Sequence, residues 1–189
     1  GFHYLKGAVD SSGKLTAWKN HFVTFAAAQG ATIGGTEFPS RFVPNFDFGS
    51  SSMPLGVPTG ALRAPGSNAY AFVFQSFIDE LAHAAGRDPC DYRRQLLAGT
   101  RQAAVLELAA EKSGWGQPLP AGRARGLAVV ASYGSIVAQV VEISQRDGAP
   151  HVHRVVCAVD CGIAIDPHNI AAQMESGVAY GLSAALWGE

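Results

Sequence analysis

Arg63 is the cationic side chain whose sequence context most clearly suggests a binding role. It lies in the segment Gly-Ala-Leu-Arg-Ala-Pro-Gly at residues 60–66, directly before a predicted helix. That segment is too rigid and too apolar for an ordinary surface charge. A fixed guanidinium can donate hydrogen bonds to an anion, and the unpaired N–H groups of a helix start favour the same ligand. The alternative is a structural arginine that braces a loop or a helix end.

Gln173 is a second candidate, on a predicted helix that also carries Gly177 and Gly181. Two glycines inside a helix cost roughly 1 kcal/mol each relative to alanine, so we expect another backbone or a ligand to approach that face closely. The amide of Gln173 could form two hydrogen bonds with an anionic cofactor. It could equally be a satisfied polar residue at a helix contact.

The third candidate is the tripeptide Tyr133, Gly134 and Ser135, which separates two apolar runs predicted as strands at residues 126–132 and 137–144. The tripeptide is either a hairpin turn or a main-chain edge presented to a ligand.

Two histidines give a weaker indication of metal binding. His151 and His153 share one face of a predicted strand, but no aspartate or glutamate flanks them at a useful spacing. A tetrahedral site needs more ligands than this pair supplies. We therefore expect a solvated pair at the edge of a sheet.

The cysteines are expected to stay reduced. On one strand, Cys157 and Cys161 would lie roughly 13 Å apart, whereas a disulfide needs Cα atoms within about 7 Å. A hydrolase that uses Cys161 and His168 is a rival interpretation, although no Gly-x-Ser-x-Gly segment accompanies them.

Composition limits the classes of partner. The 189 residues are 48% hydrophobic and carry a formal net charge of −1, which gives no general electrostatic case for nucleic acid or for an anionic membrane. No apolar run approaches the roughly 20 residues of a membrane span. The chain starts in what reads as the middle of a strand, so we expect a fragment of a longer protein.

The N-terminal part is predicted as a β-hairpin over residues 1–25, with its turn at residues 10–13. Residues 26–58 have no sustained period and are predicted as a long loop with short strand pieces. Four phenylalanines in this loop would be costly in water, so we expect them to pack against a part outside this chain: Phe38, Phe42, Phe46 and Phe48.

Three helices follow. Asn68 is predicted to cap the first, which runs to about residue 85 and is closed by Gly86. Asp88 and Pro89 precede the second, at residues 91–98, and the third spans residues 101–113. A Gly/Pro linker occupies residues 114–126.

The C-terminal part contains a further strand, at residues 151–159, and a helix that begins with Asp166 as cap and Pro167 at its first position. The predicted buried face of this helix contains Ile170, Ala171, Met174 and Val178. The order of elements predicts an α+β fold, with mixed sheet pieces and a central helical cluster. We divide it into segments 1–58, 59–122 and 123–189.

Three motifs, in this order, carry a family resemblance. They are GALRAPGSNAYAFVFQSFIDELAHAAGRDPCDYRRQLL at 60–97, GRARGLAVVASYGSIVAQVVEIS at 122–144 and VVCAVDCGIAIDPHNIAAQMESGVAYGLSAAL at 155–186. Together they resemble the large molybdenum-binding subunit of the xanthine dehydrogenase/aldehyde oxidase family, of the isoquinoline 1-oxidoreductase beta-subunit type.

The resemblance implies part of a molybdenum hydroxylase with a molybdopterin cofactor, in bacteria often the cytosine dinucleotide. Such enzymes hydroxylate an N-heterocycle or an aldehyde with oxygen from water, and electrons leave through iron–sulfur clusters in a small partner subunit. It also implies cofactor-binding positions: Leu62, Arg63 and Ala64 beside molybdenum, Tyr133, Gly134 and Ser135 near the cofactor, and Gln173, with Glu175, near the pterin.

Two departures from the family pattern matter. Ser176 stands where the family commonly has glycine. The glycine-rich segment with the family's catalytic glutamate is missing, as is a glycine–phenylalanine loop beside molybdenum. A general base must reach the proton that it removes, so we expect no catalytic residue and no metal ligand in this chain, and no activity from it alone. A cofactor-free scaffold of the same fold is the alternative.

Overall fold

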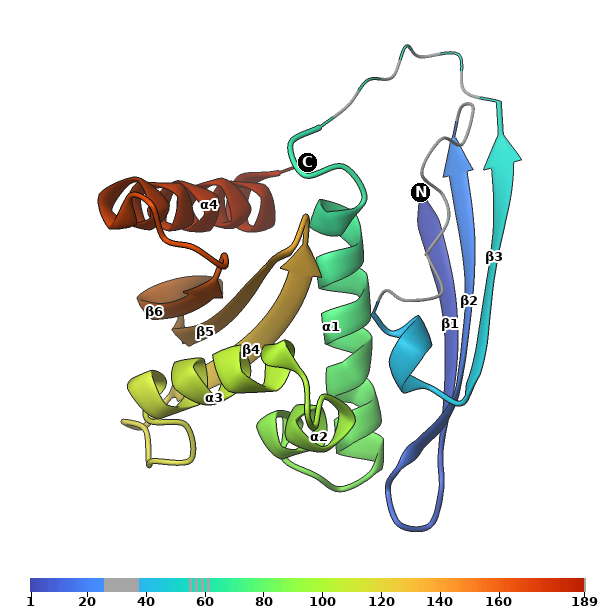
Figure 1. The fold of residues 1–189 in the computed structure, drawn as a ribbon, viewed down its shortest axis with the longest axis horizontal. Coiled ribbons are helices and arrows are strands. Elements are labelled where there is room, and N and C mark those ends of the chain that lie inside the picture. Colours follow the sequence, from blue (N-terminus) through green and yellow to red (C-terminus); the bar gives the residue numbers. More distant parts are fainter. Residues whose placement is uncertain (26–37, 55, 57, 59, 61, 189) are drawn as a thin grey trace. The chain divides into compact units, whose positions relative to one another are not determined.

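The computed structural model describes residues 1–25, 38–54, 56, 58, 60 and 62–188. The chain forms two compact units, Gly1–Gly99 and Thr100–Glu189. Each unit contains helices and a three-stranded sheet (Figure 1), which confirms the predicted α+β class. Helices of the middle segment belong to different units, because α1 and α2 fall in the first and α3 in the second.

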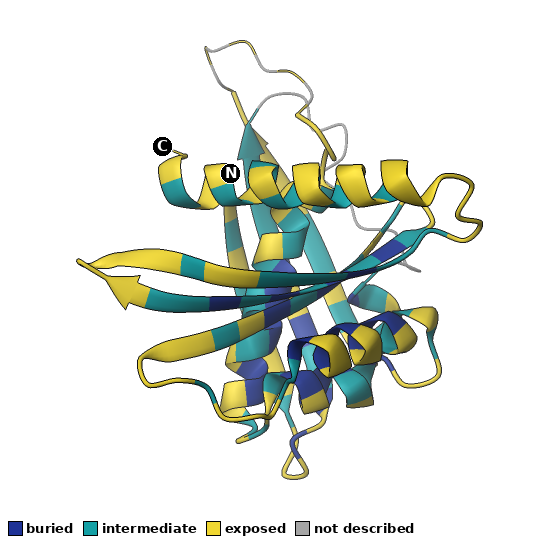
Figure 2. Ribbon diagram, turned by 90° about the vertical axis from the view of Figure 1, so that its left-hand side faces the viewer, coloured by how far each residue is buried: buried dark blue, intermediate teal, exposed yellow. Residues whose placement is uncertain are grey.

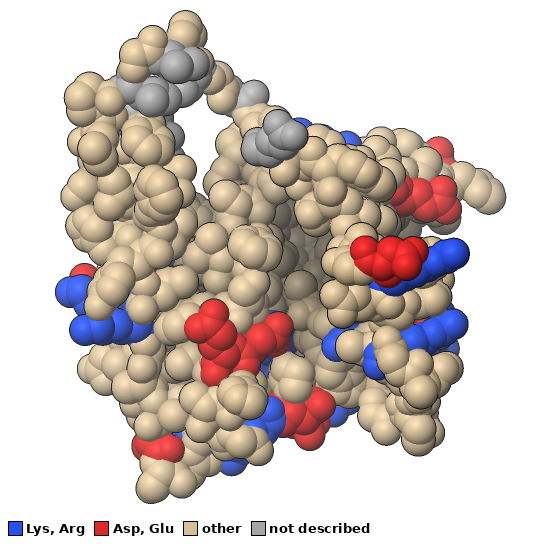
Figure 3. Space-filling view, turned by 180° about the vertical axis from the view of Figure 1, so that it is seen from behind, with Lys and Arg blue, Asp and Glu red and all other residues tan. Residues whose placement is uncertain are grey.

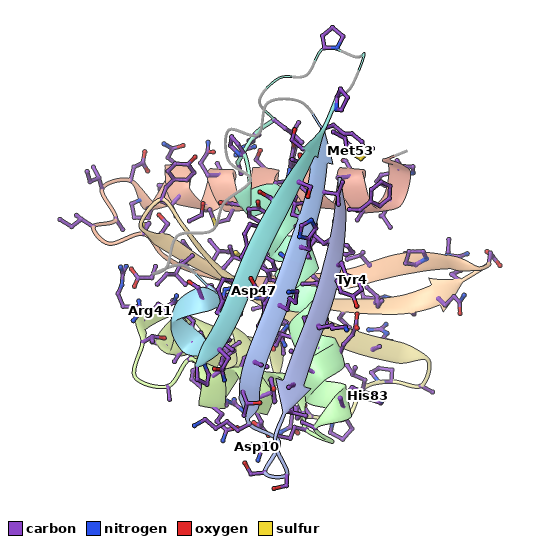
Figure 4. All side chains as sticks on the ribbon, turned by 90° about the vertical axis from the view of Figure 1, so that its right-hand side faces the viewer. Tyr4, Asp10, Arg41, Asp47, Met53 and His83 are labelled. Atoms are coloured by element: carbon purple, nitrogen blue, oxygen red, sulfur yellow. The ribbon has the colours of Figure 1, made fainter. Side chains whose placement is uncertain are left out.

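The sheet of the first unit has the order β1-β2-β3. Strands β1 (Phe2–Val9) and β2 (Leu15–Phe25) are antiparallel and form the predicted hairpin. The Asp10 carboxylate organises its turn, because it accepts hydrogen bonds from the backbone N–H groups of Ser12 and Lys14, at 2.9 and 3.0 Å. Tyr4 and Asp47 lie on the outer face of this sheet, and Asp10 lies at the turn (Figure 4).

The predicted loop at 26–58 is corrected in part. Residues 26–37 lie outside the described residues, but Asn45–Met53 forms a nine-residue strand, β3, parallel to β2. A short 3₁₀ turn, Ser40–Phe42, precedes it. The partner expected outside the chain is also wrong for three of the phenylalanines, because Phe38, Phe46 and Phe48 pack against the core of their own unit.

The helices of the first unit are α1 (Ser67–Ala84) and α2 (Pro89–Leu96). Helix α1 contacts β1, and the approach is close, since a Cβ on Gly7 would lie 2.6 Å from a methyl carbon of Leu81. The core formed in this unit consists of Leu15, Trp18, Val43, Phe74, Ile78, Leu81, Ala82 and Tyr92.

The two ends of α1 differ in how well they were predicted. Gly86, with φ of 64°, follows its C-cap as expected. The predicted cap at Asn68 is wrong, because Gly66 is the N-cap and Asn68 lies inside the first turn. The Asn68 amide instead donates to the Arg63 carbonyl at 3.5 Å. A glycine with φ of 71° at residue 66 lets the helix begin two residues earlier.

Arg93 holds α1 and α2 together. Its side chain is 1% exposed and donates to Gln75 Oε1 and the Gln75 carbonyl, both at 2.8 Å, to Asp79 Oδ1 at 2.6 Å and to the Pro89 carbonyl at 3.0 Å. A buried guanidinium is stable only when its donors are satisfied in this way. Asp88 caps α2 through the N–H groups of Cys90 and Asp91.

The second unit is an antiparallel meander of β4 (Arg123–Ser132), β5 (Ser135–Arg146) and β6 (Ala149–Asp160). Helix α3 (Arg101–Ser113), with the predicted bounds, contacts all three strands. The predicted strands are the apolar centres of longer ones. The buried side chains of this sheet alternate along the strands: Leu127, Val129, Ile136, Ala138, Val140, Glu142 and Ala158.

Glu142 is the charged member of that set. Its carboxylate accepts from Arg123 at 2.6 Å and from Arg125 at 3.4 Å. The hydrogen bond from Arg123 is the main reason that the pKa of Glu142 lies below its usual value. The paired arginines allow a carboxylate to occupy a nearly buried position in the sheet.

Helix α4 (Pro167–Trp187) completes the second unit. As predicted, Asp166 caps it, accepting from the N–H groups of His168 and Asn169 at 3.0 and 3.1 Å, and Pro167 follows. In the described part of the chain, no helix is long and apolar enough to cross a membrane.

The predicted buried face of α4 needs correction. No residue of this helix is fully buried: Ile170, Met174 and Val178 are half-buried and Ala171 is exposed. Ala171 follows Ile170 by about 100° around the helix, away from the side that faces β6. Most of α4 is therefore exposed, as Figure 2 shows. The close approach expected at Gly177 and Gly181 is not made by the described residues, since a Cβ there would meet none of their atoms within 4 Å.

Candidate cofactor-binding site

The segment with Leu62, Arg63 and Ala64 forms an exposed turn that leads into α1. Its main chain is folded onto the helix start, where the Asn68 N–H donates to the Ala64 carbonyl at 2.9 Å. Ala64 has φ of 55°, a left-handed conformation that is unfavourable for a residue with a Cβ. The turn therefore holds Arg63 at the beginning of an 18-residue helix.

Tyr133 and Gly134 form the two-residue turn between β4 and β5, with Ser132 and Ser135 as its flanking pair. Both have positive φ, 50° and 81°, as a type I′ turn requires. Asparagine is usual at the first position, and tyrosine there is strained by roughly 1 kcal/mol. The Tyr133 side chain is 87% exposed, so neither packing nor turn preference accounts for it. Strain of this kind is often retained at binding sites.

This turn and the entry into α4 leave the sheet at the same end. The register pairs Ile136 at the start of β5 with Asp160 at the end of β6, so residues 133–134 and the loop after Asp160 are on one edge. Gln173 is exposed on the second turn of α4. Within the second unit, the structure thus places Tyr133, Gly134 and Ser135 at the edge from which α4 departs. Leu62, Arg63 and Ala64 belong to the first unit.

Arg101 was not predicted to matter, yet it anchors this edge. Its guanidinium donates from Nε to Asp160 Oδ2 at 2.9 Å and lies 2.7 Å from Oδ1 through Nη2. The bond to Arg101 is the main cause, and the Gly162 N–H a further one, of a pKa of Asp160 below its usual value. A signal did exist in the sequence, since a cation in the first turn of a helix opposes the helix dipole and indicates a partner elsewhere.

The charge of the candidate residues suits an anionic ligand. Leu62, Arg63, Ala64, Tyr133, Gly134, Ser135 and Gln173 include a guanidinium, an amide, two hydroxyls and no carboxylate. Among nearby carboxylates, Asp160 pairs with Arg101 and Asp166 caps α4, while Glu175 lies about 200° around the helix from Gln173. Elsewhere, charged side chains form small groups of mixed sign on the face shown in Figure 3. This donor set fits a phosphate-bearing cofactor.

The alternative chemistries receive less support. His153 Nε2 lies 2.8 Å from Ser144 Oγ, and His151 packs edge-on to His153 at 4.7 Å. Among the residues that the structure describes, no three histidine, cysteine, aspartate or glutamate side chains are grouped for a metal. The three cysteines are free, as predicted. Burial raises the pKa of the Cys157 thiol, which disfavours the reactive thiolate.

Comparison with known proteins places the chain in a family. Residues 76–189 match the molybdopterin cofactor-binding domain. This match covers most of the chain, and the chain belongs to that family. The resemblance stated from the three motifs is therefore confirmed, whereas no individual site residue is tested by the match.

Three curated relatives are similar to the chain. The beta subunit of isoquinoline 1-oxidoreductase from Brevundimonas diminuta is 36% identical over 131 residues, 66% of this chain and 17% of the relative. Membrane-bound aldehyde dehydrogenase [pyrroloquinoline-quinone] of Gluconacetobacter polyoxogenes is 31% identical over 151 residues, 68% and 19%. A nicotinate dehydrogenase subunit from Pseudomonas putida is 28% identical over 169 residues, 76% and 14%. The chain thus spans less than a fifth of each relative.

Proposed function

We propose that this chain forms part of the molybdopterin-binding surface in the large subunit of a molybdenum hydroxylase. The observation that carries the proposal is the strained, exposed Tyr133–Gly134 turn at the sheet edge from which α4 departs, in a chain of the molybdopterin-binding family. A turn that keeps an unfavourable tyrosine conformation in solvent is explained by contact with a ligand.

Each candidate residue has a role that its chemistry supports. Arg63 donates hydrogen bonds to an anionic group of the cofactor, and the amide of Gln173 donates to it from α4. The turn at Gly134 lets the ligand approach the main chain, because a Cβ at this position would meet no described atom within 4 Å and glycine leaves that space open. When bound, the cofactor supplies the molybdenum at which a substrate carbon is hydroxylated with oxygen from water.

The finer assignments follow from the resemblance and the relatives. The cofactor is the cytosine dinucleotide form, and electrons pass to iron–sulfur clusters of a small partner subunit. The substrate is an N-heterocycle or an aldehyde, the classes named in isoquinoline oxidoreductase, nicotinate dehydrogenase and aldehyde dehydrogenase. The general base lies outside residues 1–189, so the chain alone does not turn over substrate.

Cofactor occupancy tests the proposal. The full-length subunit is produced in a host that makes molybdopterin, and its molybdenum and pterin content is measured per polypeptide. Arg63→Ala and Gln173→Ala are each expected to lower pterin content several-fold. Arg146→Ala and Gln145→Ala serve as matched controls, because both residues are exposed at the far end of β5.

Each outcome is decisive. Full pterin content in both Arg63→Ala and Gln173→Ala would refute the assigned contacts. A wild-type subunit that folds with neither pterin nor molybdenum would instead support a cofactor-free scaffold. Hydroxylation of a heterocycle by the 189-residue chain alone would contradict the absence of a catalytic base.

A further inference from the structure

The second unit exposes a group of large apolar side chains around α4. Ile163 and Ile165, in the loop before the helix, are 87% and 91% exposed, and Trp187 at its end is 74% exposed. Ala172 and Ala179 are exposed between them, seven residues and thus about two helical turns apart on one side of α4. We call these five residues the α4 surface. Contiguous apolar surface of this kind usually marks an interaction site.

The loop that carries the two isoleucines is fixed at both ends. Arg101 and the Gly162 N–H hold the Asp160 carboxylate, and Asp166 is held by the N–H groups of α4. Between these anchors the Ile165 N–H donates to the Ile163 carbonyl at 3.2 Å. The isoleucines are therefore presented by an ordered main chain, which lowers the entropy cost of docking.

The charge of the α4 surface selects the kind of partner. Helix α4 has 21 residues, of which none is lysine or arginine and one, Glu175, is acidic. Phosphate groups of a nucleic acid, of an anionic lipid or of the cofactor would find no cation on this helix. An uncharged, apolar protein surface is the complementary partner.

We propose that the α4 surface docks onto another part of the same large subunit. The lengths of the relatives support this occupant, because the match spans 14–19% of them and leaves more than four fifths of each polypeptide outside it. The proposal rests on family membership and on exposure, and does not depend on the cofactor contacts of Arg63 or Gln173. The two proposals can therefore fail separately.

Hydrogen exchange measured on the wild-type sequence tests the docking. The full-length polypeptide that contains this sequence and the 189-residue chain are compared under the same conditions. Amides of Ile163, Ala164 and Ile165 are expected to exchange at least tenfold more slowly in the full-length polypeptide. Amides at the β5–β6 turn, residues 147–148, provide an internal comparison outside the α4 surface.

A variant provides the second arm. Ile163→Asn combined with Ile165→Asn should leave the unfolding midpoint of the 189-residue chain unchanged, because both side chains are exposed in it. In the full-length polypeptide it should increase the rate of proteolysis at least tenfold. Leu108→Asn, an exposed apolar position on α3, is the matched control and should have no such effect.

Several results would overturn the proposal. Equal exchange rates in the two polypeptides, or an encoded polypeptide no longer than 189 residues, would remove the occupant. Protection that appears in the short chain only on self-association would assign the surface to a second copy. Protection that requires the small partner subunit would assign it to that subunit, and loss of stability of the short chain itself would make the isoleucines structural.

Discussion

Arg101 and Asp160 form a two-bond ion pair that joins the first residue of α3 to the last residue of β6. The Nε–Oδ2 distance is 2.9 Å and the Nη2–Oδ1 distance is 2.7 Å, across 59 residues of sequence. Paired bonds of a guanidinium with a carboxylate fix orientation as well as distance. The pair therefore sets the point at which the chain leaves the sheet for α4.

Replacing Arg101 should change how the stability of the chain depends on pH. The folded-state pKa of Asp160 lies below its usual value of about 3.9, so the ionised pair stabilises the fold above that value. This contribution is lost as the pH falls through the lowered pKa. Arg101→Gln should therefore be less stable than wild type near neutrality and equally stable at low pH. Urea unfolding at both pH values measures the difference.

Asp160→Asn is the matching control for that experiment. It removes the titrating group, so its stability relative to Arg101→Gln should not vary across the acidic range. A difference between wild type and Arg101→Gln that persists undiminished at low pH would contradict the assignment to Asp160.

Removing Arg93 should strongly destabilise the first unit. Arg93→Met retains much of the side-chain volume but leaves Gln75 and Asp79 without their partner. Loss of one member of a buried ion pair costs about 3 kcal/mol, and the partial exposure of Asp79 keeps the value at the lower end. Chemical denaturation of the chain measures this change in the free energy of unfolding.

Arg94 offers a neighbouring comparison for Arg93. It pairs with Asp91 on the exposed side of the same helix, and exposed pairs contribute less than about 1 kcal/mol. Arg94→Met should therefore have little effect. Similar losses for the two variants would show that the buried position of Arg93 is not what matters.

Relieving the strain at Tyr133 should stabilise the second unit. Asparagine tolerates positive φ and is preferred before glycine in a type I′ turn. Tyr133→Asn is expected to raise the free energy of unfolding by roughly 1 kcal/mol. Thermal unfolding followed by circular dichroism checks this, and a lower melting temperature would show that the tyrosine side chain supports the fold.

The cap of α4 is expected to be worth about 1 kcal/mol. Asp166→Ala removes the acceptor for the His168 and Asn169 N–H groups, whereas Asp166→Asn keeps one. Exchange of those two amides should accelerate in Asp166→Ala and change little in Asp166→Asn. Equal acceleration in both would indicate that the charge, rather than the hydrogen bond, stabilises the helix start.

The sequence predicted the elements that are specified locally. Helix α3 was predicted with its observed bounds because its apolar residues recur at helical spacing and Gly114 ends it. The Asp166 cap and the Tyr133–Gly134 turn are likewise local signals. Local signals also locate the candidate site residues on turns and on a helix, which is as far as periodicity extends.

The features that escaped prediction depend on contacts between distant residues. Strand β3 is rich in glycine and serine, and its pairing with β2 joins Lys19 to Asp47. The periodicity of α4 showed which residues share a side but not how little of that side is covered. The Arg101–Asp160 pair is non-local in the same way.

The parallel pairing of β3 with β2 also bears on the order of folding. In the second unit, two-residue turns join β4 to β5 and β5 to β6, so each pairing closes a short loop. In the first unit, partners in β2 and β3 are 28 residues apart along the chain. Longer loops are slower to close. The meander can therefore nucleate early, while the mixed sheet matures only after its third strand has docked.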